Sequence, residues 1–225
     1  MHWPSRAALA RIAPFALFMA LLIVRSQAPA DGAWGFDPQW LYGLSVVIAG
    51  AVLAVCWREY GELARQTLPD AREVLLAIAA GALVFVLWIH LDVAWMIIGS
   101  PSAPFKPIDA SGAINLPQVA IRFIGAALLV PLMEELFWRS FLMRWLEQPV
   151  FQGVAPQRIG VRAIVLSTFV FTLAHTLWLA AAIAGLVYAL LYVKTGKLWP
   201  AVIAHAVTNA ALGVWVVTTA NWQFW

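Results

Sequence analysis

Long apolar runs, separated by clusters of proline and glycine, dominate the pattern of hydrophobic and polar positions along the chain. Most of these runs have about the 20 residues that an α-helix needs to cross the hydrocarbon core of a bilayer. The pattern therefore predicts seven membrane-spanning helices. Their expected ranges are Leu9–Val24, Trp40–Trp57, Arg72–Ile89, Gln118–Leu146, Arg162–Thr176, Leu177–Val193 and Pro200–Ala220. A shorter apolar segment, Leu91–Ile98, is a candidate for a further short or re-entrant piece.

The composition agrees with a membrane protein. Of the 225 residues, 63% are hydrophobic and only 11% are charged, whereas about 25% of a soluble domain is charged. So few charges cannot cover a surface that faces water, and the mean hydropathy is +0.83. We predict an all-α, polytopic transmembrane helix bundle of about seven to eight spans. We expect residues 1–225 to form one integral membrane domain, with a motif-bearing core at 118–215.

The basic residues lie at the ends of the apolar runs. A net charge of +3 alone would be compatible with nucleic-acid binding, but dispersed cations at helix ends are what membrane topology requires. With a cytoplasmic N-terminus, only Arg25, Lys106 and Arg122 fall on the outer side. The cations that then lie inside are Arg6, Arg11, Arg58, Arg65, Arg72, Arg144, Arg158, Arg162, Lys194 and Lys197. This bias predicts a multi-pass protein of the inner (plasma) membrane with its N-terminus in the cytoplasm, and no nucleic-acid partner.

The first apolar run also resembles a signal peptide, because Arg6 and Arg11 precede it and Ala28-Pro29-Ala30 has the form of a cleavage site. We predict that the run is retained as the first span, with cleavage as the alternative. The single cysteine, Cys56, excludes an internal disulfide and a thiolate metal cluster within one chain.

Ionisable side chains within the predicted spans are the candidates for chemistry, because each costs about 2.5–3.5 kcal/mol at the centre of a membrane helix. The fourth span contains Glu134, Glu135 and Arg139. Glu135 and Arg139 are four residues apart, share one helix face and are expected to pair. Glu134 points about 100° away around the helix and has no cation at i+4. We therefore predict a structural ion pair beside a free carboxylate, with an ion pair and a spare glutamate as the purely structural alternative.

Two histidines lie in later spans. His175 follows Phe171 by one turn, and His205 precedes Asn209 by one turn, so each pair shares a helix face. Taken singly, each is more typical of a hydrogen bond between packed helices than of a catalytic group. In the predicted topology, however, Glu134, His175 and His205 fall in the cytoplasmic half or the middle of the bilayer. Their side chains and that of Asn209 can then face one cavity and activate water.

These three motifs in this order resemble the CAAX prenyl protease and bacteriocin-processing (CPBP, Abi) family of intramembrane proteases. The resemblance rests on Glu134-Glu135-x-x-x-Arg139, Phe171-x-x-x-His175 and His205-x-x-x-Asn209, and it extends over roughly residues 118–215. The turn from Thr195 to Pro200 is also similar to the family. Chain size and residues 134–145 look like short bacterial CAAX-protease-related proteins that are found with exosortase systems.

The resemblance implies a role for each residue. Glu134 would activate water, His175 would assist it, and His205 and Asn209 would stabilise the oxyanion. Supporting roles would fall to Glu135, Arg139 and Phe171. The family has been described both as glutamate-based and as metal-dependent. Binding of a divalent metal such as zinc by Glu134, His175 and His205 therefore stays open, since a catalytic zinc needs only three protein ligands.

Three functions compete at this point. The first is an intramembrane endopeptidase whose partners are a peptide or protein substrate, lipid-modified in one version, and the membrane lipids. The second is a non-catalytic immunity or scaffold protein of the same fold. The third is a transporter, for which internal repeats or paired broken helices would be expected and are not apparent. The intact polar motifs favour the peptidase.

Overall fold

Helices make up every named element in the computed structural model, which describes residues 5–28, 33–99, 105–109 and 111–225. Within these ranges there are two isolated β-bridges and no strand. The all-α prediction is confirmed. Pro29 and Ala30 of the alternative cleavage site lie outside the described residues.

Each of the seven predicted spans coincides with a helix. The helices are α1 (Arg6–Ser26), α2 (Trp40–Val55), α3 (Ala71–Trp88), the continuous run Leu116–Met143, α6 (Val161–Leu173), α7 (Trp178–Thr195) and α8 (Trp199–Thr219). Five of them are long and apolar enough to cross a membrane, whereas α2 and α6 are shorter apolar helices. The candidate piece Leu91–Ile98 contains only one short 3₁₀ turn, η4 (Ala94–Met96).

The long run Leu116–Met143 is not wound uniformly. It consists of α4 (Leu116–Ile124), the π-helical η5 (Gly125–Leu129), α5 (Val130–Glu135) and the π-helical η6 (Leu136–Met143). π-Helical turns are uncommon and occur frequently at functional sites. Here they flank the short α5, which carries the two adjacent glutamates.

Local signals explain where several helices begin and end. Asp70 and Glu73 form a capping box at the start of α3, and the Asn115 side chain accepts from the Gln118 amide at the start of α4. Gly196 ends α7 in the left-handed conformation, at φ 71°, which a residue without a side chain adopts without strain. The turn after Gly196 leads directly into α8.

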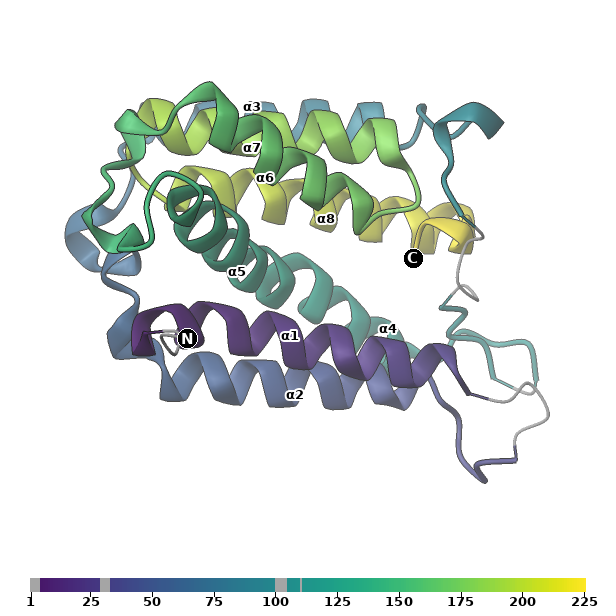
Figure 1. Cartoon of the computed structure of the whole chain (residues 1–225). Coiled ribbons are helices and arrows are strands. Elements are labelled where there is room, and N and C mark those ends of the chain that lie inside the picture. The colour runs from purple at the N-terminus through teal and green to yellow at the C-terminus, as the bar shows by residue number, and fades with distance from the viewer. Residues whose placement is uncertain (1–4, 29–32, 100–104, 110) are drawn as a thin grey trace.

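The helices form two layers with the fourth helix between them (Figure 1). Helices α1 and α2 lie side by side in one layer, α3, α6, α7 and α8 make up the other, and the run from α4 to α5 passes obliquely between the layers. Helices α3 and α8 approach closely at Gly81, where an added Cβ would collide with the Ala204 carbonyl and Val207. This contact is tightened by the Thr208 hydroxyl, which donates to the Gly81 carbonyl at 2.9 Å.

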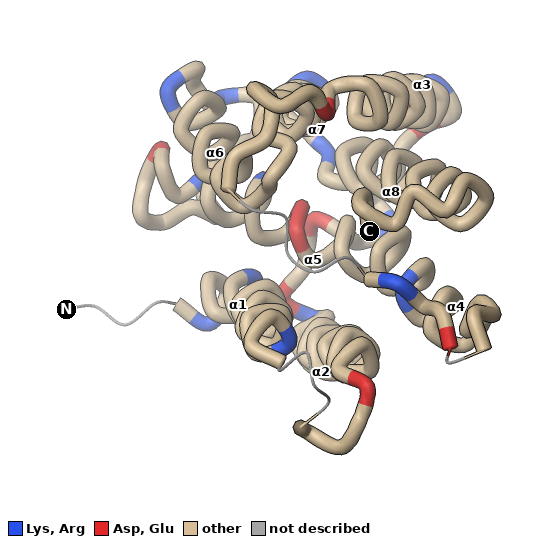
Figure 2. Tube along the Cα trace, turned by 90° about the vertical axis from the view of Figure 1, so that its right-hand side faces the viewer, with Lys and Arg blue, Asp and Glu red and all other residues tan. Residues whose placement is uncertain are grey.

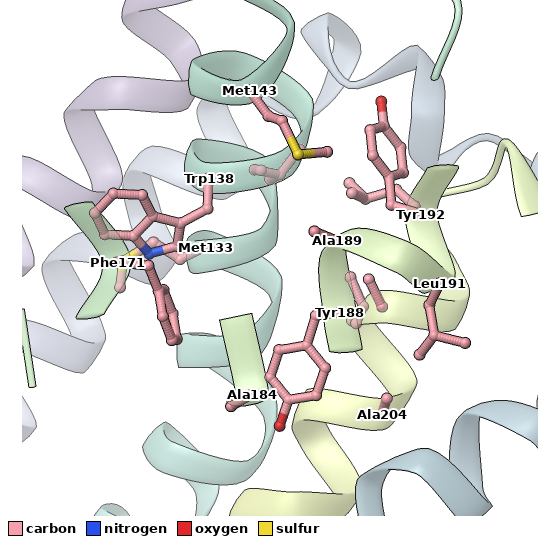
Figure 3. Close-up of a cluster of buried hydrophobic side chains, with 14 of the residues drawn as sticks. Met133, Trp138, Met143, Phe171, Ala184, Tyr188, Ala189, Leu191, Tyr192 and Ala204 are labelled. Carbon is pink, nitrogen blue, oxygen red and sulfur yellow. The ribbon is translucent and has the colours of Figure 1, made fainter. Parts of the chain in front are cut away.

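The hydrophobic core lies where the oblique helix meets α6, α7 and α8 (Figure 3). Trp138 and Phe171 pack edge to face with ring centroids 5.6 Å apart, and Tyr188 lies on α7, across from the oblique helix. Alanines such as Ala184 and Ala204 are fully buried and let the helices come close. The catalytic candidates border this core.

A polar network holds the end of the bundle at which the N-terminus lies. Arg11 is 2% exposed, pairs with Glu62 at 2.6 Å and also donates to Ser140 at 2.9 Å. Glu62 belongs to η2 (Gly61–Leu63), one of three short 3₁₀ turns between α2 and α3, with η1 (Trp57–Glu59) and η3 (Arg65–Thr67). Arg144 donates to the carbonyls of Gln152 and Val154 in the loop that contains η7 (Phe151–Gly153) and η8 (Pro156–Arg158). Both loops therefore sit at the N-terminal end of the bundle.

Candidate active site

A cavity of about 360 Å³ inside the bundle brings the four predicted catalytic residues together. Glu134 of α5, His175 of the turn between α6 and α7, and His205 and Asn209 of α8 all line it. Glu134 lies about 14 Å or less from the Met143 end of its helix, and His205 lies about 9 Å into α8. Because α6 is short, His175 lies about 20 Å from that same end of the bundle, near its middle. The polar residues therefore meet near mid-depth.

Glu134 has a carboxylate without a protein partner. It makes no hydrogen bond and no ion pair among the described residues, and its Oε2 atom is buried and unpartnered. A buried polar group normally finds a partner, because leaving one unpaired costs about 1–3 kcal/mol or more for a charged group. An unpaired carboxylate that lines a cavity is therefore suited to act on water or substrate.

Glu135 occupies the other face of α5 and is fully buried. Its Oε1 atom accepts from Arg139 Nη1 at 2.9 Å, so the ion pair predicted from the i,i+4 spacing is present. The same oxygen also accepts from His205 Nδ1 at 2.9 Å. Glu135 thus links the fourth helix to α8, a contact that the spacing of residues along the chain does not predict.

Arg139 has further partners on α6 and α7 besides Glu135. Its Nη2 atom donates to the Gly185 carbonyl at 3.0 Å, and its guanidinium lies 4.9 Å from the centre of the Phe171 ring and 5.4 Å from that of Tyr188. Cations are stabilised over aromatic faces, most strongly when they are removed from water. Phe171 therefore supports the ion pair of Glu135 as well as packing beside His175.

His175 is oriented by the residue one turn before it. Its Nδ1 donates to the Phe171 carbonyl at 2.8 Å, and the two rings lie 4.5 Å apart. The indole of Trp88, at the end of α3, packs on the other side at 5.7 Å. With Nδ1 committed as a donor, Nε2 of the neutral ring is left as an acceptor.

His205 and Asn209 are fixed by contacts that reach across the bundle. The His205 ring stacks on Tyr188 at 5.0 Å, and the Tyr188 hydroxyl donates to Thr208 at 2.7 Å. The Asn209 side-chain amide donates to the Ala126 carbonyl at 2.8 Å, in the π-helical η5. His205 Nε2 makes no hydrogen bond to any described residue, so this nitrogen is the one free for a ligand.

Sequence reasoning missed Tyr188 and the bond between Glu135 and His205. A tyrosine at the centre of an otherwise apolar helix was the available signal, because a buried hydroxyl needs a partner. His90 and Asp92, which follow α3, are exposed and do not line the cavity.

The three candidate metal ligands, Glu134, His175 and His205, line one cavity but are not gathered into a ligand group. Among the residues that the structure describes, no group of three or more His, Cys, Asp or Glu side chains lies close enough to hold a metal ion. The bond from His205 Nδ1 to Glu135 leaves Nε2 of that ring free, so Glu134, His175 and His205 remain the three side chains that could serve as ligands.

The cavity extends from the catalytic candidates toward the end of the bundle that is opposite the N-terminus. Its lining includes Leu22 near the end of α1, Trp88 at the end of α3, and Phe224 in the C-terminal turn η9 (Trp222–Phe224). Figure 2 views this end and shows the acidic pair of α5 at the centre, between α1 and α2 on one side and α7 and α8 on the other.

Comparison with known families adds to this geometry. Residues 116–211 match the family model described as Type II CAAX prenyl endopeptidase Rce1-like. This segment contains the four predicted catalytic residues and the ion pair of Glu135 with Arg139. Comparisons with curated proteins and with solved structures give no match. Through this segment, the chain is similar to the CAAX protease (CPBP) family, and its apolar helices fit a multi-pass membrane protein.

Proposed function

We propose that the protein is an intramembrane endopeptidase that hydrolyses a peptide bond with a water molecule activated by Glu134. The observation that carries the proposal is the cavity in which the unpartnered Glu134 carboxylate, His175, His205 and Asn209 meet inside an apolar bundle. Ionisable residues this deep in a membrane protein are costly to maintain and point to function. The family match supports a protease at the level of the family.

The side chains divide the reaction between them. Glu134 takes a proton from the water, whose oxygen attacks the substrate carbonyl, and then gives that proton to the leaving amine. His175 orients the water, because its Nε2 is an acceptor while Nδ1 is held by the Phe171 carbonyl. The developing oxyanion is stabilised by His205, which donates from Nε2 in its protonated form, and by the Asn209 amide. Glu135 offsets the charge of that imidazolium through its bond to Nδ1.

The placement of charge defines the orientation that we propose. Most of the 14 lysines and arginines lie in or next to the loops at the N-terminal end of the bundle, whereas Arg25, Lys106 and Arg122 lie toward the other end. By the positive-inside rule, the N-terminal end faces the cytoplasm of a cell whose inner (plasma) membrane holds the protein. The cavity is then entered from the outer face, and its substrate is a peptide or lipid-modified protein presented there.

The experiment that tests this function is the comparison of peptide hydrolysis by the wild type and by Glu134→Gln. The amide keeps the shape of the side chain but cannot take up a proton. Loss of cleavage with the fold retained supports the peptidase, and equal cleavage by both proteins contradicts the assignment of Glu134. No cleavage by either protein favours the scaffold alternative.

A further inference from the structure

Arg122 of α4 is a cation in the cavity that the proposed reaction does not use. It lines the same cavity as Glu134, and its Nε atom is buried without a hydrogen-bond partner. It forms no ion pair in the described ranges of the chain, since no carboxylate lies within 4 Å of its guanidinium. A guanidinium in an apolar bundle without an anion is costly unless something else occupies the position of that anion.

Two aromatic rings hold the guanidinium in place. Its central carbon lies 4.3 Å from the centre of the Tyr42 ring and 5.4 Å from that of Phe105. These contacts stabilise the charge and restrict its position, but they leave the buried Nε donor of the guanidinium without an acceptor. Asp37, an acidic group on this side of the bundle, is already bonded to the amide of Gln39 and the side chain of Gln118.

Arg25 provides a comparison within the same region. Its guanidinium lies 5.4 Å from the same Phe105 ring, yet Arg25 is near the end of α1 and does not line the cavity. An arginine at a helix end commonly extends to the lipid phosphates. Arg122 instead lies inside the cavity with part of its side chain buried, so its anion is expected to arrive with the substrate.

We propose that Arg122 binds a carboxylate of the peptide substrate, and so selects substrates with an acidic group close to the bond that is cut. The inference rests on the proposed peptidase function. Arg122 and Glu134 are twelve residues apart on one helical run, which is at most about 18 Å at 1.5 Å per residue. An extended peptide covers that length in about five residues at 3.3 Å each. The carboxylate therefore lies within about five residues of the scissile bond, either at a chain end or on an Asp or Glu side chain.

Binding tests this inference without any need for catalysis. The full chain carrying Glu134→Gln is reconstituted in phosphatidylcholine nanodiscs and titrated with three apolar hexapeptides. The first has a free C-terminal carboxylate, the second is amidated, and the third is amidated with one internal Asp. Because a charge-assisted hydrogen bond is about twice as strong as a neutral one, one or both acidic peptides should bind at least about tenfold more tightly than the neutral one. The tighter of the two identifies the source of the carboxylate.

Substitutions then assign the preference to Arg122. Adding Arg122→Gln should remove the difference between acidic and neutral peptides, whereas Arg122→Lys should keep a smaller difference because it keeps the charge. Arg25→Gln is the matched control and should leave the ratio unchanged within about twofold. The inference is overturned if Arg122→Gln keeps the acid preference or if no peptide binds. Peptide hydrolysis by the protein with Glu134 intact is measured separately. A failure of the proposed peptidase function can then be distinguished from a failure of carboxylate binding by Arg122.

Discussion

Glu135 accepts a hydrogen bond from His205 Nδ1 at 2.9 Å, although 70 residues separate the two along the chain. The same carboxylate oxygen accepts from Arg139, so one buried anion holds two cationic or polar partners from different helices. Glu134, its neighbour in sequence, has no such partners. The two adjacent glutamates therefore have different surroundings, and we propose that Glu135 holds the site together while Glu134 takes part in the reaction.

Replacement of Glu135 should lower stability much more than replacement of Glu134. Glu135→Gln leaves Arg139 without a counter-charge in the bundle, and breaking a buried ion pair costs about 3–5 kcal/mol. For a chain of this length, we expect the midpoint of thermal unfolding in detergent to fall by about 5 °C or more. Glu134→Gln should change it little, because that carboxylate makes no bond among the described residues.

A double variant separates the ion pair from general damage. Glu135→Gln with Arg139→Gln removes both charges, so its loss of stability should be smaller than the sum of the two single losses. Additive losses of stability would contradict the ion pair. Equal midpoints of thermal unfolding for Glu134→Gln and Glu135→Gln would contradict the expectation that only Glu135 stabilises the bundle.

The orientation of the bundle can be tested by labelling from one side. In a Cys56→Ser background, Ser111→Cys places a thiol at the cavity end of the bundle and Gln148→Cys places one at the N-terminal end. A maleimide that does not cross membranes should label Ser111→Cys in intact cells, and Gln148→Cys only after permeabilisation, because the cations at the N-terminal end favour the cytoplasm. The reverse pattern would place the cavity mouth in the cytoplasm.

The network of Arg11 and Glu62 makes the N-terminal end sensitive to acid. Burial acts to raise the pKa of Glu62, but the hydrogen bond and charge of Arg11 outweigh it and hold the pKa below its ordinary value of 4.5. A lowered native pKa means that the carboxylate stabilises the fold above pH 4.5 and that this contribution is lost as the pH falls through the native pKa.

Thermal unfolding between pH 6 and pH 3, recorded as a function of pH, checks this dependence. The wild type should lose stability steeply at the acidic end, and Glu62→Gln should be less stable at pH 6 and respond less to acid. The exposed Asp92→Asn serves as the control and should follow the wild type. A wild-type slope in Glu62→Gln would contradict the proposed coupling.

Local patterns were sufficient for much of the architecture. Apolar length predicted all seven helices, and the i,i+4 spacing predicted the pair of Glu135 with Arg139, because both depend on neighbours within one helix. Counting residues along each predicted span placed Glu134 and the two histidines at similar depths in the bilayer, which predicted that they share a cavity. In the structure, all three line one cavity. Their catalytic roles stay predictions.

Patterns within one helix did not predict the contacts between helices. The bond from His205 to Glu135 depends on how α8 crosses the fourth helix, and the packing of Tyr188 on His205 depends on the position of α7. The end of the bundle toward which the cavity extends also depends on such contacts. Trp88 and the C-terminal turn line the cavity there, and hydropathy does not predict that they meet.

The most direct test of the central claim is hydrolysis in water enriched in ¹⁸O. Purified wild type, Glu134→Gln and the loop control Glu147→Gln, each in nanodiscs, are incubated with a mixture of membrane-derived peptides, and new C-termini are read by mass spectrometry. If Glu134 activates water, wild type and control yield the same new C-termini, each carrying one ¹⁸O. Glu134→Gln should yield about 100-fold fewer, the effect of losing a general base. Equal yields from Glu134→Gln and wild type, or no labelled product from any of the three, would contradict the claim.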